Sequence, residues 1–199
     1  AKKSIFFEQK ILREAVGSQD QIAATYGGFN KIIFNKGGNF KVKPFLLKRK
    51  TINKLNNNLI LLYTGLKRTA HNIASSYISK LQSSKKINMI NILNLAKEGE
   101  KALLNNELDE FASLLHESWL EKRELDKSIT TSQIDDIYKT AIEKGAKGGK
   151  LLGAGGGGFF LFYVPYHKQK SFIRYFKKFI TVPFKFSFEG SRIIFKDAT

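Results

Sequence analysis

The stretch "KLLGAGGGGFFLFYVP", from Lys150 to Pro165, places five glycines directly before a continuous apolar run. Glycine loses more backbone entropy on folding than any other residue, so a block of it marks special backbone angles or a group that approaches the backbone closely. The following "FFLFYV", residues 159–164, is apolar at every position, which is typical of a strand buried on both faces. The glycine block is therefore either a tight approach to a core strand or part of a ligand site.

The spacing of the glycines matches neither of two common phosphate-binding patterns. It is not the G-x-x-x-x-G-K-[ST] of a P-loop, and we expect no strand before it of the kind that a dinucleotide fingerprint requires. Lys147 and Lys150 do precede the block, so backbone N–H groups and cations could face one anion together. Strand packing and anion binding both remain open.

Length and composition exclude several classes of protein. The 199 residues suit one domain or two small ones, and 42% hydrophobic residues are ample for a core. The absence of cysteine excludes a disulfide framework and a thiolate metal site. No apolar run approaches the roughly 20 residues that span a bilayer, and the N-terminus is not of the signal-peptide type. We expect a cytoplasmic protein with no membrane partner.

The formal net charge of +17 favours anionic partners in general. However, only six of the 34 basic residues are arginine, the better residue for bidentate reading of bases and phosphates, and the lysines are spread along the chain. We interpret most of this charge as a solvated surface and expect no nucleic-acid partner. A non-catalytic basic RNA-binding domain is the alternative, and it would need exposed aromatic side chains on a sheet face near lysine or arginine.

The hydrophobic pattern mixes helices and strands without strict alternation, which favours an α+β fold. Residues 48–58, "KRKTINKLNNN", look like a polar connection and a domain boundary, and Trp119 is expected in the core. Ser132 is expected to cap the helix that begins beside it. Helices are predicted at 4–15, 69–81, 87–104, 108–119, 132–145 and 168–178. Strands are predicted on either side of "NKGG" at 35–38 and at 59–65, 159–164, 184–188 and 192–195.

Two carboxylates near the N-terminus are candidates for metal-assisted chemistry. Asp20 follows a helix break in "GSQDQ", where a lone aspartate is usually a helix cap, and Glu8 lies twelve residues earlier. Magnesium-dependent phosphoryl transfer needs a carboxylate for the metal and a residue that orients or deprotonates the attacking hydroxyl. Glu8 and Asp20 could form that pair, although their spacing alone does not show it.

Three stretches together resemble the C-terminal part of the GHMP kinases: "GSQDQIAATYGGFN", "LLYTGLKRTAHNIA" and "GAKGGKLLGAGGGGFFLFYV". The third is similar to the third motif of that superfamily. The first two are most similar to its D-glycero-D-manno-heptose 7-phosphate kinase branch. This resemblance implies a remnant of the N-terminal domain at residues 1–50. It implies a ferredoxin-like α/β sandwich with inserted helices at residues 51–199.

The resemblance also implies an activity and a set of roles. The expected reaction passes the γ-phosphoryl of ATP, with Mg²⁺, to a sugar hydroxyl of heptose 7-phosphate; unphosphorylated fucose or galactose is the alternative acceptor. The catalytic aspartate of the family falls on Asp20, and its magnesium-ligating glutamate falls on Glu8. The glycines of its third motif, placed against the phosphate-binding loop and the substrates, fall on Gly153, Gly155, Gly156, Gly157 and Gly158.

Gly65, Arg68 and Lys150 are the expected contacts to the acceptor. Arg68 follows a strand end, where its planar fork suits a phosphate already on the substrate, whereas the neighbouring Lys67 is expected to point elsewhere. The family's own phosphate-binding loop, of the type Pro-x-x-x-Gly-Leu-Gly-Ser-Ser, does not occur in these residues. We therefore expect a C-terminal part of a longer kinase that lacks turnover by itself.

Overall fold

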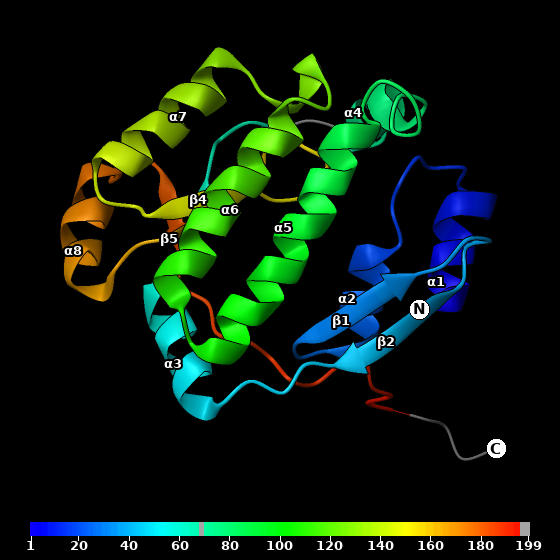
Figure 1. Cartoon of the computed structure of the whole chain (residues 1–199), viewed down its shortest axis with the longest axis horizontal. Coiled ribbons are helices and arrows are strands. Elements are labelled where there is room, and N and C mark those ends of the chain that lie inside the picture. The colour runs from blue at the N-terminus through cyan, green and yellow to red at the C-terminus, as the bar shows by residue number, and fades with distance from the viewer. Residues whose placement is uncertain (68–69, 196–199) are drawn as a thin grey trace. The chain divides into compact units, whose positions relative to one another are not determined.

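The computed structural model describes residues 1–67 and 70–195, so Arg68 lies outside the described residues (Figure 1). The chain divides into two compact units. The first is Ala1–Leu47 together with the segment that starts at Lys185, and the second is Lys48–Phe184. The sequence predicts a boundary after residue 50 and assigns the C-terminal segment to the second domain. In the structure, that segment belongs to the first unit.

The first unit begins with helix α1 (Lys2–Phe6), which continues as the π-helix η1 (Phe7–Ile11). This helix is shorter than predicted, and Arg13 beyond it has a left-handed φ of 55°. Helix α2 (Gln19–Tyr26) follows. Strands β1 (Asn30–Phe34) and β2 (Phe40–Pro44) then pair antiparallel, which confirms the hairpin around "NKGG".

The C-terminal segment of the first unit, residues 185–195, contains neither helix nor strand, so both strands predicted there are wrong. Its phenylalanines pack without forming a ladder: Phe186 and Phe188 lie against Phe29 with ring centroids 4.5 and 6.1 Å apart. The backbone is fixed locally, because the N–H of Gly28 donates to the carbonyl of Ser187 at 2.9 Å. Aromatic packing accounts for the alternation that predicted a strand.

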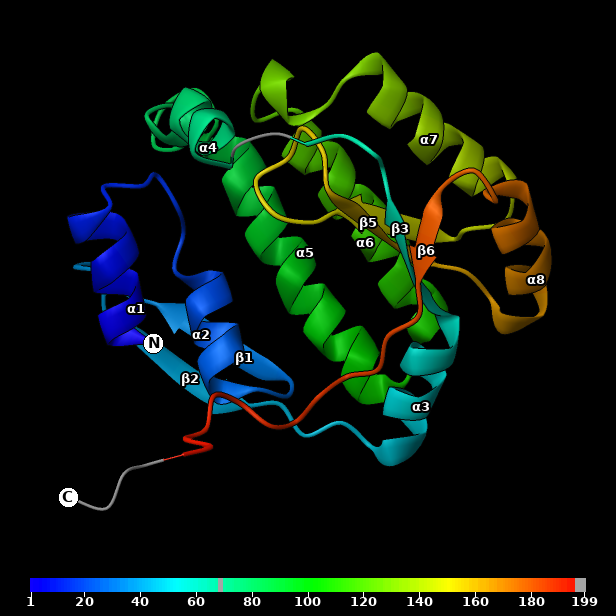
Figure 2. The ribbon, with the colours of Figure 1, turned by 180° about the vertical axis from the view of Figure 1, so that it is seen from behind.

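The second unit is built on a four-stranded sheet with the order β4-β5-β3-β6. Strands β5, β3 and β6 are labelled in Figure 2, and β4 is labelled beside β5 in Figure 1. Each neighbouring pair is antiparallel. Strands β3 (Leu59–Tyr63) and β5 (Phe159–Tyr163) were predicted and are confirmed. Strands β4 (Gly148–Leu151) and β6 (Ile180–Val182) were not. A strand therefore does precede the glycine block, but a second strand follows it where a dinucleotide fold has a helix.

Helices surround this sheet. Residues 49–58, predicted as a connection, form helix α3 (Arg49–Asn58), which buries Thr51 and Leu55 four residues apart on one face. Helix α7 is capped by Thr131, whose hydroxyl accepts from the N–H of Ile134, and not by the predicted Ser132. The other helices of the unit are α4 (Ala70–Ile78), α5 (Lys86–Asn105), α6 (Leu108–Arg123), η2 (Lys127–Ile129), α7 (Ser132–Glu143) and α8 (Tyr166–Tyr175).

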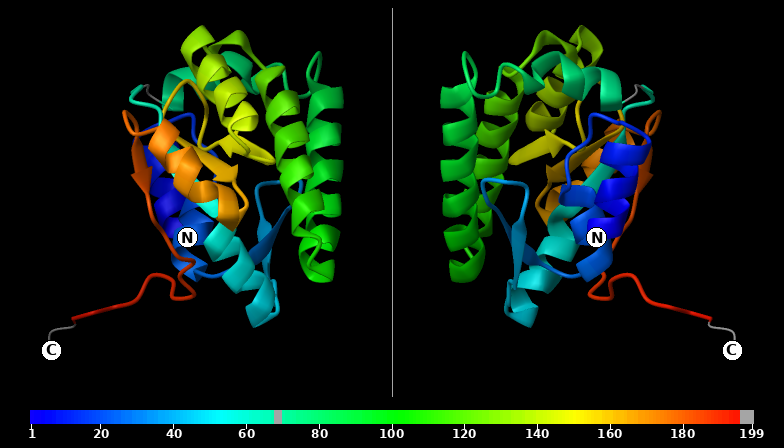
Figure 3. Two further views of the ribbon diagram at one scale, coloured as in Figure 1. Left: turned by 90° about the vertical axis from the view of Figure 1, so that its left-hand side faces the viewer. Right: turned by 90° about the vertical axis from the view of Figure 1, so that its right-hand side faces the viewer.

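The core lies on the sheet face that carries Phe160 and Phe162, which α7 and α8 cover with aromatic side chains. Trp119 of α6 packs edge-on against Phe160 and is fully buried, as predicted. Helices α5 and α6 lie side by side (Figure 3). Helix α6 also runs against β4 so closely that a Cβ on Gly148 would lie 1.8 Å from the carbonyl oxygen of Ala112. Within residues 1–67 and 70–195, no helix is both long and apolar enough to cross a membrane.

Candidate functional site

The glycine loop, defined here as residues 152–158, joins β4 to β5. Gly153, Gly155, Gly156 and Gly158 have φ of 70°, 121°, 72° and 90°, angles that other residues adopt only with strain. Close approach adds a second reason for glycine. A Cβ on Gly155 would lie 2.9 Å from the Cα of Ile129, and one on Gly157 would lie 2.5 Å from the carbonyl oxygen of Leu66.

Main-chain hydrogen bonds hold the second half of the loop to two other segments of the unit. The N–H of Gly156 donates to the carbonyl of Ile129 at 2.8 Å, and that of Gly158 donates to the carbonyl of Leu66 at 3.0 Å. The carbonyl of Gly158 accepts from both the N–H and the hydroxyl of Thr64, each at 2.9 Å. The N–H of Leu152 also donates, to the carbonyl of Phe159 at 2.9 Å, so three of the loop's amides are already occupied by the protein and are not free for a phosphate.

The loop borders a hollow of about 510 Å³ on the second unit. Its other walls are apolar side chains of the sheet, among them Tyr63 and Phe159, whose rings pack at an angle of 40° with centroids 5.0 Å apart. Lys67 also lines the hollow, although a regular strand end would point it elsewhere. The volume is within the range of small-molecule sites, and the combination of an apolar wall, a tight backbone and one cation suits an anionic ligand with an apolar part.

The lysines expected to face an anion beside the loop are otherwise engaged. The ammonium of Lys147 pairs with Asp109, and that of Lys150 donates to the hydroxyl of Ser118 at 3.0 Å. Lys150 is not among the residues that line the hollow. Burial lowers the pKa of Lys150 below its usual value. The structure thus does not bring Lys147, Lys150 and the glycine amides together around one point.

Sequence reasoning missed Lys122, which lies in the last turn of α6. Its ammonium donates to the carbonyls of Leu151 at 3.0 Å and Gly153 at 2.6 Å, at the start of the glycine loop. Burial and, secondarily, the charge of Lys150 lower the pKa of Lys122 to about 7. A signal was present: Lys122 extends the apolar stripe of the helix three residues beyond Trp119, where an exposed lysine is not expected.

The two carboxylates lie in the first unit. Glu8 is in η1, and its carboxylate accepts from the side-chain amide of Gln21 at 2.5 Å, which brings it to the residue that follows Asp20. Asp20 is exposed in the first turn of α2, whose N-cap is Ser18, so it is not the cap but is placed favourably for the helix dipole. No group of three metal-ligating side chains occurs in the described part of the chain. Mg²⁺ is commonly held by one or two carboxylates plus substrate phosphates, and Glu8 fits that mode.

Of the acceptor contacts expected from sequence, only Gly65 and Lys150 are described. Gly65 follows β3, is exposed, and has a φ of 78°, while a Cβ on it would meet nothing within 4 Å. The backbone angle therefore explains why this position is glycine. Gly65 lies in the turn before Leu66, whose carbonyl accepts from the loop, and Lys67, which lines the hollow. Arg68 lies outside the described residues.

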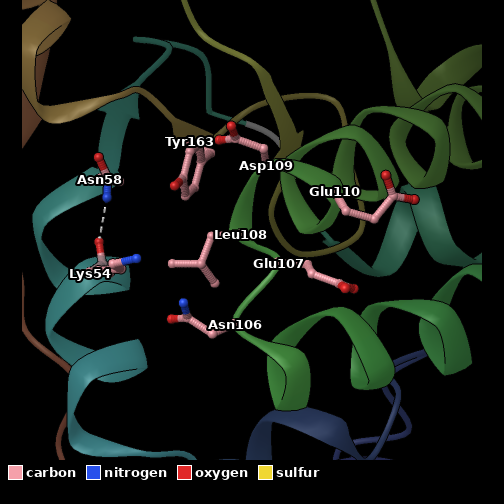
Figure 4. Close-up of a pocket in the computed structure, with 8 residues that line it drawn as sticks. All are labelled: Lys54, Asn58, Asn106, Glu107, Leu108, Asp109, Glu110 and Tyr163. Atoms are coloured by element: carbon pink, nitrogen blue, oxygen red, sulfur yellow. Dashed lines mark hydrogen bonds between the residues drawn. The ribbon is translucent and has the colours of Figure 1, made fainter.

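A second hollow of about 480 Å³ lies between α3 and the turn that joins α5 to α6 (Figure 4). Three acidic residues border it, but the carboxylates of Glu107 and Glu110 point away from Lys54 and Leu108 (Figure 4), and Asp109 pairs with Lys147. The side chains do not converge on one ligand position, so we assign no function to this hollow.

Residues 100–180 match the family model of the GHMP kinase C-terminal domain. The chain is 31% identical over 179 residues to the D-glycero-alpha-D-manno-heptose 7-phosphate kinase of Campylobacter jejuni, a match that covers 89% of this chain and 53% of that protein. It is 30% identical over 158 residues to the bifunctional fucokinase/GDP-fucose pyrophosphorylase of Arabidopsis thaliana, covering 77% of this chain and 15% of that protein.

Solved structures lead to the same family. A D-glycero-D-manno-heptose 1-phosphate kinase from Bacteroides thetaiotaomicron superimposes with a TM-score of 0.71 at 26% identity, covering 95% of this chain and 52% of that one. The chain thus spans about half the length of its heptose kinase relatives. These matches confirm the α+β fold and the resemblance seen in the motifs, and the chain belongs to the GHMP kinase superfamily, whose C-terminal domain it carries.

Proposed function

We propose that this chain contributes to an ATP- and Mg²⁺-dependent sugar kinase that phosphorylates a hydroxyl of a heptose phosphate. The glycine loop and its hollow carry the proposal, because a backbone arch stripped of side chains lets a bulky anion approach closely. The relatives support a kinase over the RNA-binding alternative. Because the chain spans about half of its heptose kinase relatives, the activity belongs to the full-length protein that contains it.

Each site residue has a separate role in this proposal. Asp20 orients the acceptor hydroxyl and takes its proton, for which its exposed carboxylate is suited. Glu8 holds the metal ion, which neutralises charge on the transferring phosphoryl when bound. The glycine loop contacts the phosphates with the backbone that its hydrogen bonds to Ile129 and Leu66 leave exposed to the hollow.

The relatives differ in the acceptor that their names give: a heptose 7-phosphate, a heptose 1-phosphate and fucose. Heptose 7-phosphate is our first choice, because the relative named for it is 31% identical and matches 89% of the chain. We propose that Arg68 reads the phosphate already present on the acceptor, and that Lys67, which lines the hollow, adds positive charge nearby. Gly65 and Lys150 are proposed only as backbone and structural support for that contact.

The test is nucleotide consumption by the full-length protein with Mg²⁺ and each of four acceptors: heptose 7-phosphate, heptose 1-phosphate, fucose and galactose. We expect turnover with heptose 7-phosphate. In Arg68→Gln, kcat/KM should fall about ten- to a hundred-fold for the sugar phosphate and change little for a free sugar, as expected for loss of one charge-assisted contact. A preference for free fucose or galactose would move the assignment to that branch, and no turnover with any sugar would overturn the proposal.

A further inference from the structure

The two halves of the glycine loop are held in different ways. The second half is fixed by main-chain bonds to Ile129 and Leu66 and by the close packing at Gly155 and Gly157. The first half has one main-chain bond, from the N–H of Leu152 to the carbonyl of Phe159, and lacks such packing beyond it: a Cβ on Gly153 would meet nothing within 4 Å, and Leu152 is 40% exposed. Both residues line the hollow, so the position of Gly153 in particular affects its shape.

We infer that Lys122 is a positioning residue that fixes the first half of the glycine loop through its hydrogen bonds to the carbonyls of Leu151 and Gly153. The side chain reaches from the last turn of α6 to the start of the loop, so it joins the loop to a long helix. The effect on loop geometry is independent of any reaction. Its consequence for phosphoryl transfer rests on the proposed function.

The surroundings of Lys122 leave it free for this task. Within residues 1–67 and 70–195 it takes part in no ion pair, whereas its neighbours on the helix are engaged elsewhere: Glu121 accepts from Asn88 and Asn91, and Arg123 pairs with Asp135. The one charged group that lowers its pKa is Lys150, also a cation. Two carbonyls need two N–H donors, and a lysine amine supplies at least two whether it is protonated or neutral.

An alternative role for Lys122 is to satisfy the carbonyls at the edge of the sheet without any effect on the glycine loop. Strand β4 lies at the edge of the sheet, and its outward carbonyls need donors. The hydroxyl of Tyr138 donates to the carbonyl of Gly149 at 3.2 Å, and Lys122 serves Leu151 in the same way. If Lys122 only completed this edge, its loss would loosen β4. The shorter bond, at 2.6 Å, is to Gly153, which lies beyond the end of the strand, and it points to control of the loop.

The absence of cysteine from the sequence permits a matched chemical test in the 199-residue chain. Lys122→Cys would be alkylated in the unfolded state and refolded. 2-Bromoethylamine restores a lysine-like side chain with its terminal amine, and 1-bromopropane gives a side chain of the same length without a donor. Lys139→Cys, at an exposed position of α7, would be treated identically as the control. The readout is amide hydrogen exchange resolved by NMR.

The amide of Leu152, which donates to the carbonyl of Phe159, reports on the first half of the loop, and the amide of Gly156, which donates to the carbonyl of Ile129, reports on the second half. We expect the Leu152 amide to exchange about ten-fold faster in the propyl form than in the aminoethyl form, which corresponds to the loss of roughly one hydrogen bond. The Gly156 amide and the β5 amides should be unchanged. The two forms at Lys139 should not differ. Equal exchange in the two Lys122 forms would overturn the inference. Faster exchange spread over β4 and β5 alike would reduce Lys122 to an edge cap and overturn it too.

Activity gives a second and separable readout. In the full-length kinase, the propyl form should lower kcat about ten-fold or more relative to the aminoethyl form, because small displacements of a positioning element are costly to rate. If the side chain at position 122 only filled space, the propyl and aminoethyl forms should have the same kcat, because the two side chains have the same size. If the protein proves not to be a kinase, this comparison fails and the exchange measurement still decides the role of Lys122.

Discussion

Lys122 is a lysine that folding pushes toward its neutral form. Its pKa falls from the usual 10.5 to about 7 on folding, first because it is buried and second because Lys150 is near. Between these two values the unfolded chain binds a proton that the folded chain does not. The free energy of unfolding must therefore rise with pH across this window and level off above the unfolded pKa.

We expect the free energy of unfolding of the wild-type chain to rise by up to about 2 kcal/mol between pH 7 and pH 9 through this one residue. Lys122→Met should flatten the rise, and Lys139→Met should leave it intact. Urea denaturation followed by the fluorescence of Trp119, the only tryptophan, gives the measurement. Because Lys150 also has a lowered pKa, a small slope should persist in Lys122→Met. A slope equal to that of the wild type would contradict the prediction.

Asp20 offers the sharpest test of the proposed chemistry at a single residue. In the full-length enzyme, Asp20→Asn keeps the shape of the side chain but removes the acceptor for the hydroxyl proton. We expect kcat to fall about 10²–10⁴-fold, with little change in substrate affinity. Asp20 is exposed and does not cap α2, so the fold should be unaffected and the circular dichroism spectrum unchanged. A nearly normal kcat would leave Asp20 with only a favourable interaction with the helix dipole.

Among the elements, the contact between α6 and β4 depends on a glycine whose role is packing. A Cβ on Gly148 would lie 1.8 Å from the carbonyl oxygen of Ala112. Relieving this overlap would require the backbone of β4 or of α6 to move, which costs free energy. Gly148→Ala should therefore destabilise the second unit by about 3 kcal/mol or more. Gly99→Ala, in the middle of α5 and 3.8 Å from the ring of Phe111, is the matched control and should stabilise by about 0.5–1 kcal/mol. Chemical denaturation of both variants makes the comparison, and similar effects would contradict it.

The elements also show which parts of the fold can be predicted from the sequence. Helical periodicity was sufficient for α5 and α6, and a continuous apolar run was sufficient for strand β3. It failed for α3, whose asparagines and lysines hide a face of only two buried residues, Thr51 and Leu55. It failed for β4 because two of the four residues of "GGKL" have no side chain. Gly148 is required by Ala112 of α6, 36 residues away in sequence, and Gly149 is required by the neighbouring strand β5.

For the site, the glycine loop itself could be predicted, because clustered glycine has few explanations. Its supports could not. The carbonyls of Ile129 and Leu66 accept from the loop through their main chain, which leaves no trace in side-chain identity. The prediction for Lys67 assumes a regular strand end, but the left-handed φ of Gly65 interrupts the strand before it, and Lys67 lines the hollow. Backbone geometry decided these positions.

At the scale of the whole molecule, the two units of the chain differ in how well they bury their apolar side chains. Every member of the main hydrophobic core lies in the second unit, Lys48–Phe184. In the first unit, the helical segment α1–η1 leaves Phe6, Phe7, Ile11 and Leu12 each more than half exposed. Exposed apolar side chains in such a run are a liability for a free protein. The second unit therefore has the larger apolar core.

We therefore expect residues 48–184 to fold when produced alone. Trp119 and Phe160 are fully buried within this unit, so the tryptophan emission should be that of a buried indole and should change cooperatively on denaturation. Residues 1–47 produced alone should show no such transition by circular dichroism. A non-cooperative second unit would show that it needs the first one to fold.

The anchoring of the glycine loop has a consequence for the order of folding. Its supports come from Leu66 and from the region that holds Lys122 and Ile129, and both regions are far from the loop in sequence. Contacts of such separation form late, because the entropy of closing the intervening loops is lost before they stabilise anything. The hollow should thus be the last feature of the second unit to appear during refolding and the first to vanish during partial unfolding. A kinase built on this domain would lose its loop geometry, and with it substrate binding, well before its sheet melts.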